Sequence, residues 1–425
     1  MSKRVLLISN DTAFASKRGI YYYSNALIKA MKEKYELGLL TQAYHPENSE
    51  ILESLSAIPH YFNERYNKIK RIEFYFKYFL NFTNEYTYAH NTHSKIITDY
   101  SNSIDFFINR PVFYYYNKMY LLIPGLGLHD LKIDSLNTED IIFTTSPLNI
   151  KSSKHKVIQT LHDVIPLNDE YHQVDFNRKI YGLTKADKIL AMSNYTKESF
   201  LNYYPSLEDK IEVVYQAIDI DENLIQMSQD EHLSKIVLNK YNLEPKKYMF
   251  FVGAIEYRKN IHNLIAAFKV ASKGNQELKL IIAGKSHGSK YLNEYGLLGY
   301  THEDNIGNIQ FIGEISNLEK VCLIRNSRAF LFPSLLEGFG IPVVEAQILG
   351  TPVLTSNNSS LTEVAGGSAL LVDNPENVEE LANNIRNLWS DDVLCNDLSN
   401  KGLENTKRFT SNGFANNVNR IIANV

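Results

Sequence analysis

The stretch A-F-L-F-P-S at residues 329–334, followed by E-G-F-G-I-P-V-V-E at residues 337–345, decides the fold of this chain. The first stretch is a short apolar run that ends in turn residues, which is typical of a buried parallel strand. Pro342 suits the start of a helix, and we expect that helix to begin at about Ile341. Glu337 is therefore predicted at the carboxyl end of a strand, where open α/β sheets bind their ligands.

The same stretch offers a second carboxylate and several backbone donors. Glu345 lies about one turn into the predicted helix, and helical side chains lean back toward the N-terminus, so its carboxylate is expected to reach the same cleft. The N–H groups of Phe339, Gly340 and Ile341 open the helix, and glycines let a ligand approach closely. The alternative is that Glu345 only complements the helix dipole and that Glu337 is a solvated loop carboxylate.

Length and composition exclude several classes of protein. A chain of 425 residues with 44% hydrophobic content is too long for one ordinary core, which predicts two domains. The net charge of −4 gives no basic footprint for nucleic acid. Cys322 and Cys395 cannot form a disulfide framework and fit a reducing cytoplasm. The apolar stretch at the N-terminus is too short for a signal peptide, and no stretch is long enough to span a bilayer as a helix, so we expect a cytoplasmic protein.

Strand and helix patterns alternate twice along the chain, which predicts the α/β class with two Rossmann-like domains. We expect the first domain at residues 1–225, the second at 226–408 and a terminal helical segment at 409–425, with the polar stretch 219–229 as the linker. The expected strands are 4–9, 156–161, 188–192 and 211–215 in the first domain, and 248–253, 278–283, 309–312, 329–333, 352–355 and 369–372 in the second; helices are expected at 21–34 and 414–425.

Two cations stand in V-G-A-I-E-Y-R-K-N at residues 252–260. Asn260 is a good N-cap for the amphipathic helix that follows, so Arg258 and Lys259 are predicted just before a helix N-terminus, as exposed side chains. That end of a helix already carries partial positive charge, and a bound anion would remove the mismatch. The alternative is a pair of solvated loop cations that interact with Glu256.

His162 and Asp163 end a predicted strand in T-L-H-D-V-I-P at residues 160–166. A histidine in such a place is a candidate for substrate contact, and the alternative is a structural histidine whose ring is satisfied by its neighbours.

The triplet Asp219-Ile220-Asp221 has the D-x-D form with which another transferase fold binds a metal through carboxylate oxygens. It falls in the predicted linker, so we interpret it as solvated charge and predict no catalytic metal.

A Tyr-rich insertion is expected at about residues 50–138. Its apolar residues fall at helical spacing between residues 62 and 79, which favours an amphipathic helix that covers a core. The alternative is a surface for the acceptor or for the membrane interface.

Taken together, these motifs resemble those of the retaining glycosyltransferases of family 4, which have the two-Rossmann-domain GT-B architecture, and most of all its mannosyltransferase-like subgroup. The resemblance covers nearly all of the second domain and patches of the first. It rests on the E-x₇-E pair Glu337 and Glu345, the R-K-N and H-D-x-x-P motifs, and the stretches at residues 18–27, 192–197, 282–285 and 359–366.

The resemblance implies a role for each candidate residue. Glu337 would face the sugar near its anomeric carbon, and Glu345 would accept the ribose hydroxyls. His162 would contact the donor sugar across the cleft from the first domain. Arg258 and Lys259 would hold the diphosphate and stabilise the leaving group, which is the work of a metal in other transferases. The remaining donor-binding candidates are Gly19, which is otherwise a simple turn glycine, Gly253, Lys285 near the base, Gly338, Phe339, Gly340 and Ile341.

The implied reaction moves a hexose from a nucleotide-sugar to an acceptor hydroxyl with retention of configuration and without a metal cofactor. GDP-mannose is the preferred donor, with UDP-sugars as the alternative. The implied acceptor is a lipid-linked or growing surface glycan, with peripheral contact to the inner face of the membrane. A sugar-nucleotide epimerase, a phosphorylase and a non-catalytic sugar-binding scaffold remain open on the same architecture.

Overall fold

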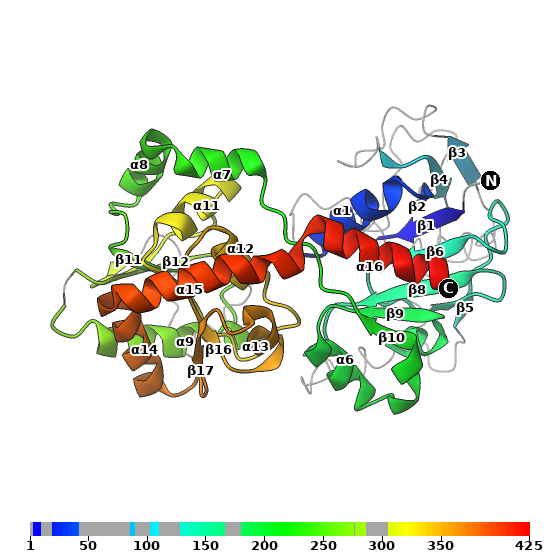
Figure 1. Ribbon diagram of the computed structural model, residues 1–425. Coiled ribbons are helices and arrows are strands. Elements are labelled where there is room, and N and C mark those ends of the chain that lie inside the picture. Colours follow the sequence, from blue (N-terminus) through cyan, green and yellow to red (C-terminus); the bar gives the residue numbers. More distant parts are fainter. Residues whose placement is uncertain are drawn as a thin grey trace, which may run out of the picture. The chain divides into compact units, whose positions relative to one another are not determined.

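The computed structural model describes residues 3–9, 19–41, 86–89, 103–109, 128–165, 180–275, 277–285 and 305–425. The chain divides into two compact units: unit 1 is Met1–Ala217 with Ser411–Val425, and unit 2 is Ile218–Thr410 (Figure 1). Within the described residues, no helix is both long and apolar enough to cross a membrane. The Tyr-rich stretch between residues 62 and 79 lies outside the described residues.

Unit 1 is built on a sheet whose strands, as far as they are described, have the order β10-β9-β8-β6-β1-β2-β4-β3. All neighbouring strands pair in parallel except β3 and β4. The strands are β1 (Arg4–Ile8), β2 (Glu36–Thr41), β3 (Tyr86–Ala89), β4 (Phe106–Asn109), β6 (Ile141–Thr144), β8 (Lys156–Leu161), β9 (Lys188–Ala191) and β10 (Ile211–Val213), with β5 (His129–Asp130) and β7 (Ile150–Lys151) paired separately.

The described helices of unit 1 include one from the far end of the chain. Helix α16 packs against α1, and the Asn419 side-chain amide donates to the Ala30 carbonyl at 2.9 Å. The terminal segment is thus part of unit 1, and the fold class expected from the sequence is confirmed. The helices are α1 (Gly19–Lys32), η4 (Gly182–Lys185), α6 (Asn194–Leu201), η5 (Pro205–Lys210) and α16 (Ser411–Asn424).

Unit 2 has a second sheet, with the described strands in the order β13-β14-β12-β11-β15-β16-β17. Among these described strands, only β13 runs antiparallel to its neighbour. The strands are almost wholly buried, which is why their sequences are continuous apolar runs. They are β11 (Tyr248–Val252), β12 (Lys279–Ala283), β13 (Asn305–Ile306), β14 (Ile309–Phe311), β15 (Ala329–Phe332), β16 (Val353–Ser356) and β17 (Leu370–Val372).

Helices cover the faces of this sheet and share one core with it (Figure 1). The long C-terminal helices α14 and α15 follow the last strand, and α14 packs against α9. The described helices of unit 2 are α7 (Glu222–Gln229), α8 (Glu231–Lys240), η6 (Tyr257–Lys259), α9 (Ile261–Ala271), α11 (Asn317–Asn326), α12 (Ile341–Ile348), α13 (Ser359–Ala365), α14 (Val378–Ser390), α15 (Asp392–Asn405) and η7 (Thr406–Phe409).

The boundary between the units differs from the expected one. It lies after Ala217 rather than after residue 225. The expected linker 219–229 contains helix α7, and Ile220, Leu224 and Ile225 pack on the core of unit 2. These apolar side chains escaped the sequence analysis because polar residues surround them.

Candidate active site

The strand order of unit 2 contains a topological switch point at β11. The chain leaves β11 toward β12 on one side and later returns to β15 on the other. The loops after β11 and β15 therefore diverge at the carboxyl edge of the sheet, and such a switch point is where open α/β sheets bind ligands. Arg258 and Lys259 follow β11, and Glu337 follows β15.

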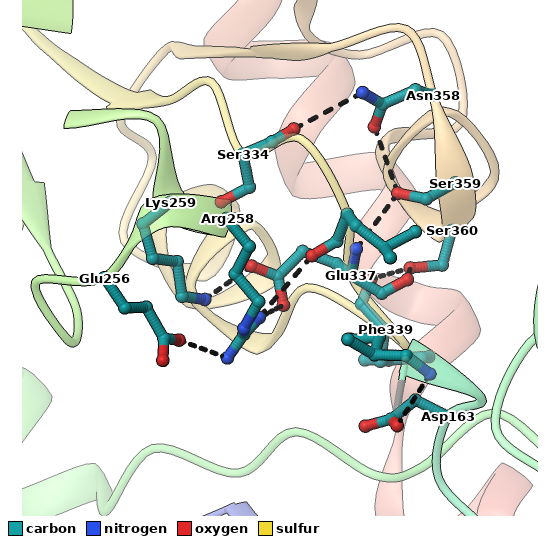
Figure 2. A network of polar contacts seen from close by, with 12 residues as sticks. Asp163, Glu256, Arg258, Lys259, Ser334, Glu337, Phe339, Asn358, Ser359 and Ser360 are labelled. Atoms are coloured by element: carbon teal, nitrogen blue, oxygen red, sulfur yellow. Dashed lines mark hydrogen bonds and ion pairs between the residues drawn. The ribbon is translucent and has the colours of Figure 1, made fainter. Parts of the chain in front are cut away.

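These three side chains meet, as Figure 2 shows. The Arg258 Nη1 atom donates to Glu337 Oε2 at 2.9 Å, and the Lys259 ammonium donates to Glu337 Oε1. Each oxygen of one carboxylate is thus bound by a different cation, which fixes its orientation. The two loops are also joined through their backbones, because the Leu335 N–H donates to the Arg258 carbonyl at 2.7 Å.

Lys259 is buried, which corrects the expectation of an exposed side chain. Its side chain is 9% exposed, and its ammonium lies 4.7 Å from the centre of the Phe332 ring. Burial lowers the pKa of Lys259 from its ordinary value, and the charge of Glu337 opposes that shift. Glu337 is equally enclosed, with a side chain 10% exposed. The Lys259–Glu337 ion pair is therefore buried, and each charge is stabilised mainly by its partner rather than by water.

Arg258 is one-third exposed and contacts two carboxylates. Its Nη2 atom lies 2.6 Å from Glu256 Oε1, while Nη1 bonds Glu337. The interaction of Arg258 with Glu256 was one of the alternatives from the sequence, and the two side chains do form an ion pair. Arg258 also contacts the buried carboxylate of Glu337, so it links the buried cluster to the solvent-facing edge of the site.

Asn260 precedes α9 as expected, but its side chain does not cap that helix. It adopts a left-handed conformation with φ of 60°, and its amide donates to the Pro333 and Pro375 carbonyls at 3.1 and 2.6 Å. The amide is fully buried. Asn260 therefore anchors the loop that contains Arg258 and Lys259. The anchor point is the end of β15, and Glu337 lies in the loop that follows this strand.

The loop from Glu337 to Gly340 is held by the start of α13. The Ser359 hydroxyl accepts from the Glu337 N–H at 3.2 Å, and the Ser360 hydroxyl lies 2.9 Å from both the Glu337 and Phe339 carbonyls, to which it donates (Figure 2). Gly340 has φ of 108°, and a Cβ there would lie 2.8 Å from a methyl group of Leu361. The glycine is thus required where the loop turns into α12. Gly338 lies within this loop, and Ile341 begins the helix.

Glu345 has a partner that the sequence analysis missed. Lys320, on α11, donates from its ammonium to Glu345 Oε1 at 2.6 Å. The two side chains are 22% and 14% exposed, so the ion pair is mostly buried. The two residues lie on separate helices, and no sequence motif links them. Glu345 itself is in α12 at the predicted place.

Two glycines end neighbouring strands near this site. Gly284, after β12, has φ of 142°, and a Cβ there would lie 1.8 Å from the Gly253 carbonyl oxygen, so only glycine fits. Gly253 itself follows β11. Lys285 follows Gly284, and its exposed ammonium lies 3.6 Å from Glu314 Oε2. Gly253 and Gly284 thus place no side chain at this edge of the sheet, and the exposed ammonium of Lys285 lies next to them in the chain.

In unit 1, His162 follows β8 and its ring is held in place. The Nε2 atom lies 2.7 Å from the Thr145 carbonyl oxygen, which can only accept, so the ring is the Nε2–H tautomer. The Tyr23 ring packs edge-on at 4.9 Å. Burial lowers the pKa of His162 to about 4, and the Thr145 carbonyl opposes that shift. The ring is therefore neutral at pH 7, with Nδ1 as an acceptor.

Gly19 is the first residue of helix α1. The D-x-D triplet is partly explained by the same kind of local structure, because Asp221 caps α7 by accepting from the Asn223 N–H at 2.9 Å. In the described part of the chain no cluster of three or more histidine, cysteine or acidic side chains is arranged to hold a metal ion.

Solved structures share this architecture along the whole chain. Anabaena Alr3699/HepE in complex with UDP and glucose matches with a TM-score of 0.62 and 13% identity, covering all of both chains. An α,α-trehalose-phosphate synthase (UDP-forming) from Burkholderia vietnamiensis matches with a TM-score of 0.65 and 14% identity, covering 100% of this chain and 99% of the other. The two parallel-sheet α/β units therefore define a protein of the GT-B fold.

A family model matches most of unit 2. Residues 235–405 are similar to the model of the glycosyl transferases group 1. The Arg258–Lys259–Glu337 cluster lies within the matched residues.

Three curated relatives are mannosyltransferases. The O-antigen chain mannosyltransferase B of Escherichia coli is 28% identical over 279 residues, which cover 64% of this chain and 71% of that protein. The O-antigen chain mannosyltransferase RfbU of Salmonella typhimurium is 28% identical, with 54% of this chain and 60% of RfbU covered. The serotype-specific mannosyltransferase WbdA of E. coli is also 28% identical over 60% of this chain, but the match spans about a third of its length (32%).

Proposed function

We propose that this protein is a retaining glycosyltransferase that moves mannose from GDP-mannose to a hydroxyl of a glycan or lipid-linked acceptor in the synthesis of a surface polysaccharide. The observation that carries the proposal is the meeting of Arg258, Lys259 and Glu337 at the switch point of the unit 2 sheet. Two cations and a fixed carboxylate at that edge suit a substrate that is anionic at one end and develops positive charge at the other.

Arg258 and Lys259 are assigned to the donor diphosphate. As the bond to the sugar breaks, negative charge builds on the leaving phosphate, and prearranged cations stabilise it without a metal ion. Arg258 is the more accessible of the two, with a side chain one-third exposed. It presents a planar fork suited to phosphate oxygens, whereas Lys259 acts from inside the protein as a fixed charge.

Glu337 is assigned to the sugar. We assign its carboxylate to the neighbourhood of the anomeric carbon of a sugar attached to that diphosphate, because a negative charge there favours the developing oxocarbenium ion. We assign retention to a front-face path in which the leaving phosphate helps to deprotonate the acceptor, so Glu337 orients and stabilises rather than attacks.

Glu345 is assigned to the ribose hydroxyls and Lys285 to the neighbourhood of the base. In unit 1, His162 is assigned to a hydroxyl of the donor sugar. Because its Nε2–H is committed to Thr145, Nδ1 is the atom that would accept from that hydroxyl. A neutral ring suits this contact, since a sugar hydroxyl carries no charge.

The choice of mannose and of a surface polysaccharide is supported by the O-antigen mannosyltransferases among the relatives. A UDP-sugar is the second candidate donor, because the group 1 glycosyltransferase match does not depend on the base. An epimerase or a non-catalytic sugar-binding protein on the same fold is a separate possibility that the acceptor requirement distinguishes.

A thermal-shift panel of GDP, UDP, ADP and their sugars tests the donor, because a ligand that binds the folded state raises its melting temperature. We expect GDP and GDP-mannose to give the largest shifts. Labelled nucleotide-sugar is then incubated with and without a glycan acceptor, and product without acceptor would indicate an epimerase. Transfer should persist in excess EDTA. Loss of transfer in EDTA with recovery in manganese would overturn the metal-independent assignment.

A further inference from the structure

Lys320 occupies a position that helix electrostatics disfavours. It lies in the first turns of α11, whose N-terminus carries partial positive charge and is closed by a capping box between Ser316 and Glu319. Glu319 cannot be the reason for the lysine, because its carboxylate already accepts from Ser316, Lys240 and Tyr241. The ion pair that Lys320 makes is instead with a residue outside α11.

Its partner is Glu345. The Lys320 ammonium lies 2.6 Å from Glu345 Oε1, and the pair joins α11 to α12. With side chains 22% and 14% exposed, both charges are largely removed from water. A mostly buried ion pair gains little net stability, because desolvation offsets the attraction. Its value lies in holding one geometry, and the carboxylate that it holds is a donor-site carboxylate.

We propose that Lys320 is a positioning residue of the donor site, which orients Glu345 so that its second oxygen, Oε2, faces the ribose hydroxyls of the nucleotide. This inference rests on the proposed function. Lys320 binds Oε1, which leaves Oε2 to accept hydrogen bonds from vicinal hydroxyls. Without Lys320, the carboxylate would rotate and share its charge with solvent. Lys320 thus controls discrimination between ribose and sugars that lack those hydroxyls.

The test compares GDP with 2′,3′-dideoxy-GDP by calorimetry. We expect the unmodified protein to bind GDP at least about tenfold more tightly than the dideoxy analogue. A factor of this size corresponds to one charge-assisted hydrogen bond. In Lys320→Met we expect the preference to fall below about threefold, through weaker binding of GDP with little change for the analogue. Lys320→Arg keeps the cation and should retain most of the preference.

Lys240→Met is the matched control. Lys240 also makes a 2.6 Å contact to a partly buried glutamate, Glu319 of α11, which the sequence does not single out as a donor-site residue. Its loss should leave the ribose preference unchanged. A purely structural role for Lys320 would weaken both nucleotides equally, in step with a lower melting temperature, and that result would overturn the inference.

The design separates this inference from the proposed function. If the unmodified protein binds neither GDP nor UDP, the donor-site assignment fails and the inference fails with it. If UDP binds and GDP does not, the same comparison is made with 2′,3′-dideoxy-UDP. If a nucleotide binds and Lys320→Met keeps the full ribose preference, the positioning role is wrong while the proposed function stands.

Discussion

The carboxyl edges of the two sheets have similar topology and opposite chemistry. In unit 2 the loops after β11 and β15 bring together two cations and two carboxylates, Arg258 and Lys259 with Glu256 and Glu337. In unit 1 the described loops after β6 and β8 bring together a neutral histidine and a backbone carbonyl, His162 and Thr145. Asp163 follows His162 in the same loop, so the difference lies in the cations, which gather in unit 2. In the proposed assignment the two cations bind the diphosphate and the neutral ring of His162 binds a hydroxyl, so one fold gives two binding chemistries through its loops.

The largest expected effect comes from Glu337→Gln, which removes the charge on which the unit 2 edge is centred. We expect kcat to fall by two to three orders of magnitude, or roughly 2.7–4 kcal/mol, because an electrostatic stabiliser of the transition state is lost. The Kd for GDP should not rise, because Arg258 and Lys259 become more available to phosphate. Steady-state kinetics and calorimetry measure the two effects. Glu404→Gln, in an exposed pair with Lys407, is the control. Near-normal turnover with lost affinity would reverse the assigned roles.

The second prediction separates the two cations. Lys259→Met leaves the buried Glu337 with only Arg258, so we expect the free energy of unfolding to fall by about 3 kcal/mol, near the lower end for breaking a buried ion pair. Arg258→Met should cost less than about 1 kcal/mol, because its guanidinium is one-third exposed and loses less by returning to water. Urea unfolding measures both. Equal losses would mean that Lys259 is not the enclosed member of the pair.

Both variants are also expected to weaken the binding of GDP, by about 1.5–3 kcal/mol for each lost charge-assisted contact. Calorimetry at a temperature where both variants remain folded gives this value. Unchanged affinity in the two variants would refute the diphosphate assignment, whatever their stability.

The third prediction concerns pH and the neutral His162 ring of unit 1. The pKa of His162 is about 4 in the folded state and near 6.5 when unfolded. Between those values the unfolded state binds more protons, so stability is complete above pH 6.5 and is lost as the pH falls toward 4. Between pH 7.5 and pH 5 this amounts to about 2 kcal/mol. In His162→Phe, urea unfolding should show a pH dependence weaker by that amount. An identical slope would mean that His162 titrates normally.

The sequence predicted six of the seven described strands of unit 2 to within one or two residues, because strands buried on both faces leave continuous apolar runs, and it missed the two-residue strand β13. For example, the run expected at 329–333 is β15, Ala329–Phe332. Among the strands of unit 1 that it did not predict are β2 and β6. β2 begins at Glu36, soon after α1 ends at Lys32, and no glycine or proline between them marks the change from helix to strand.

Side-chain partners were harder to predict than strands. Arg258, Lys259 and Glu337 could be assigned to one edge of a sheet from strand ends alone, and they meet there. The burial of Lys259 depends on the Phe332 ring below it, and the partner of Glu345 depends on how α11 lies beside α12. Those are tertiary distances, and a single sequence without an alignment carries no record of them.

The smallest expected effect tests the support beneath the charged edge. The Ser360 hydroxyl is buried and lies 2.9 Å from the Glu337 and Phe339 carbonyls. Ser360→Ala should cost about 1 kcal/mol of stability, because those acceptors lose their donor. Thr355→Val is the matched control, since it removes a buried hydroxyl that donates to the Phe332 carbonyl at 2.9 Å, within the strand rather than in the loop. Urea unfolding should show a similar loss in the free energy of unfolding for both variants. Calorimetry should show a few-fold weaker affinity for GDP in Ser360→Ala alone. This follows because Ser360 sets the path of the loop whose N–H groups are expected to bind the donor, whereas Thr355 donates to the end of β15. Equal GDP affinity in the two variants would show that the loop keeps its geometry without Ser360.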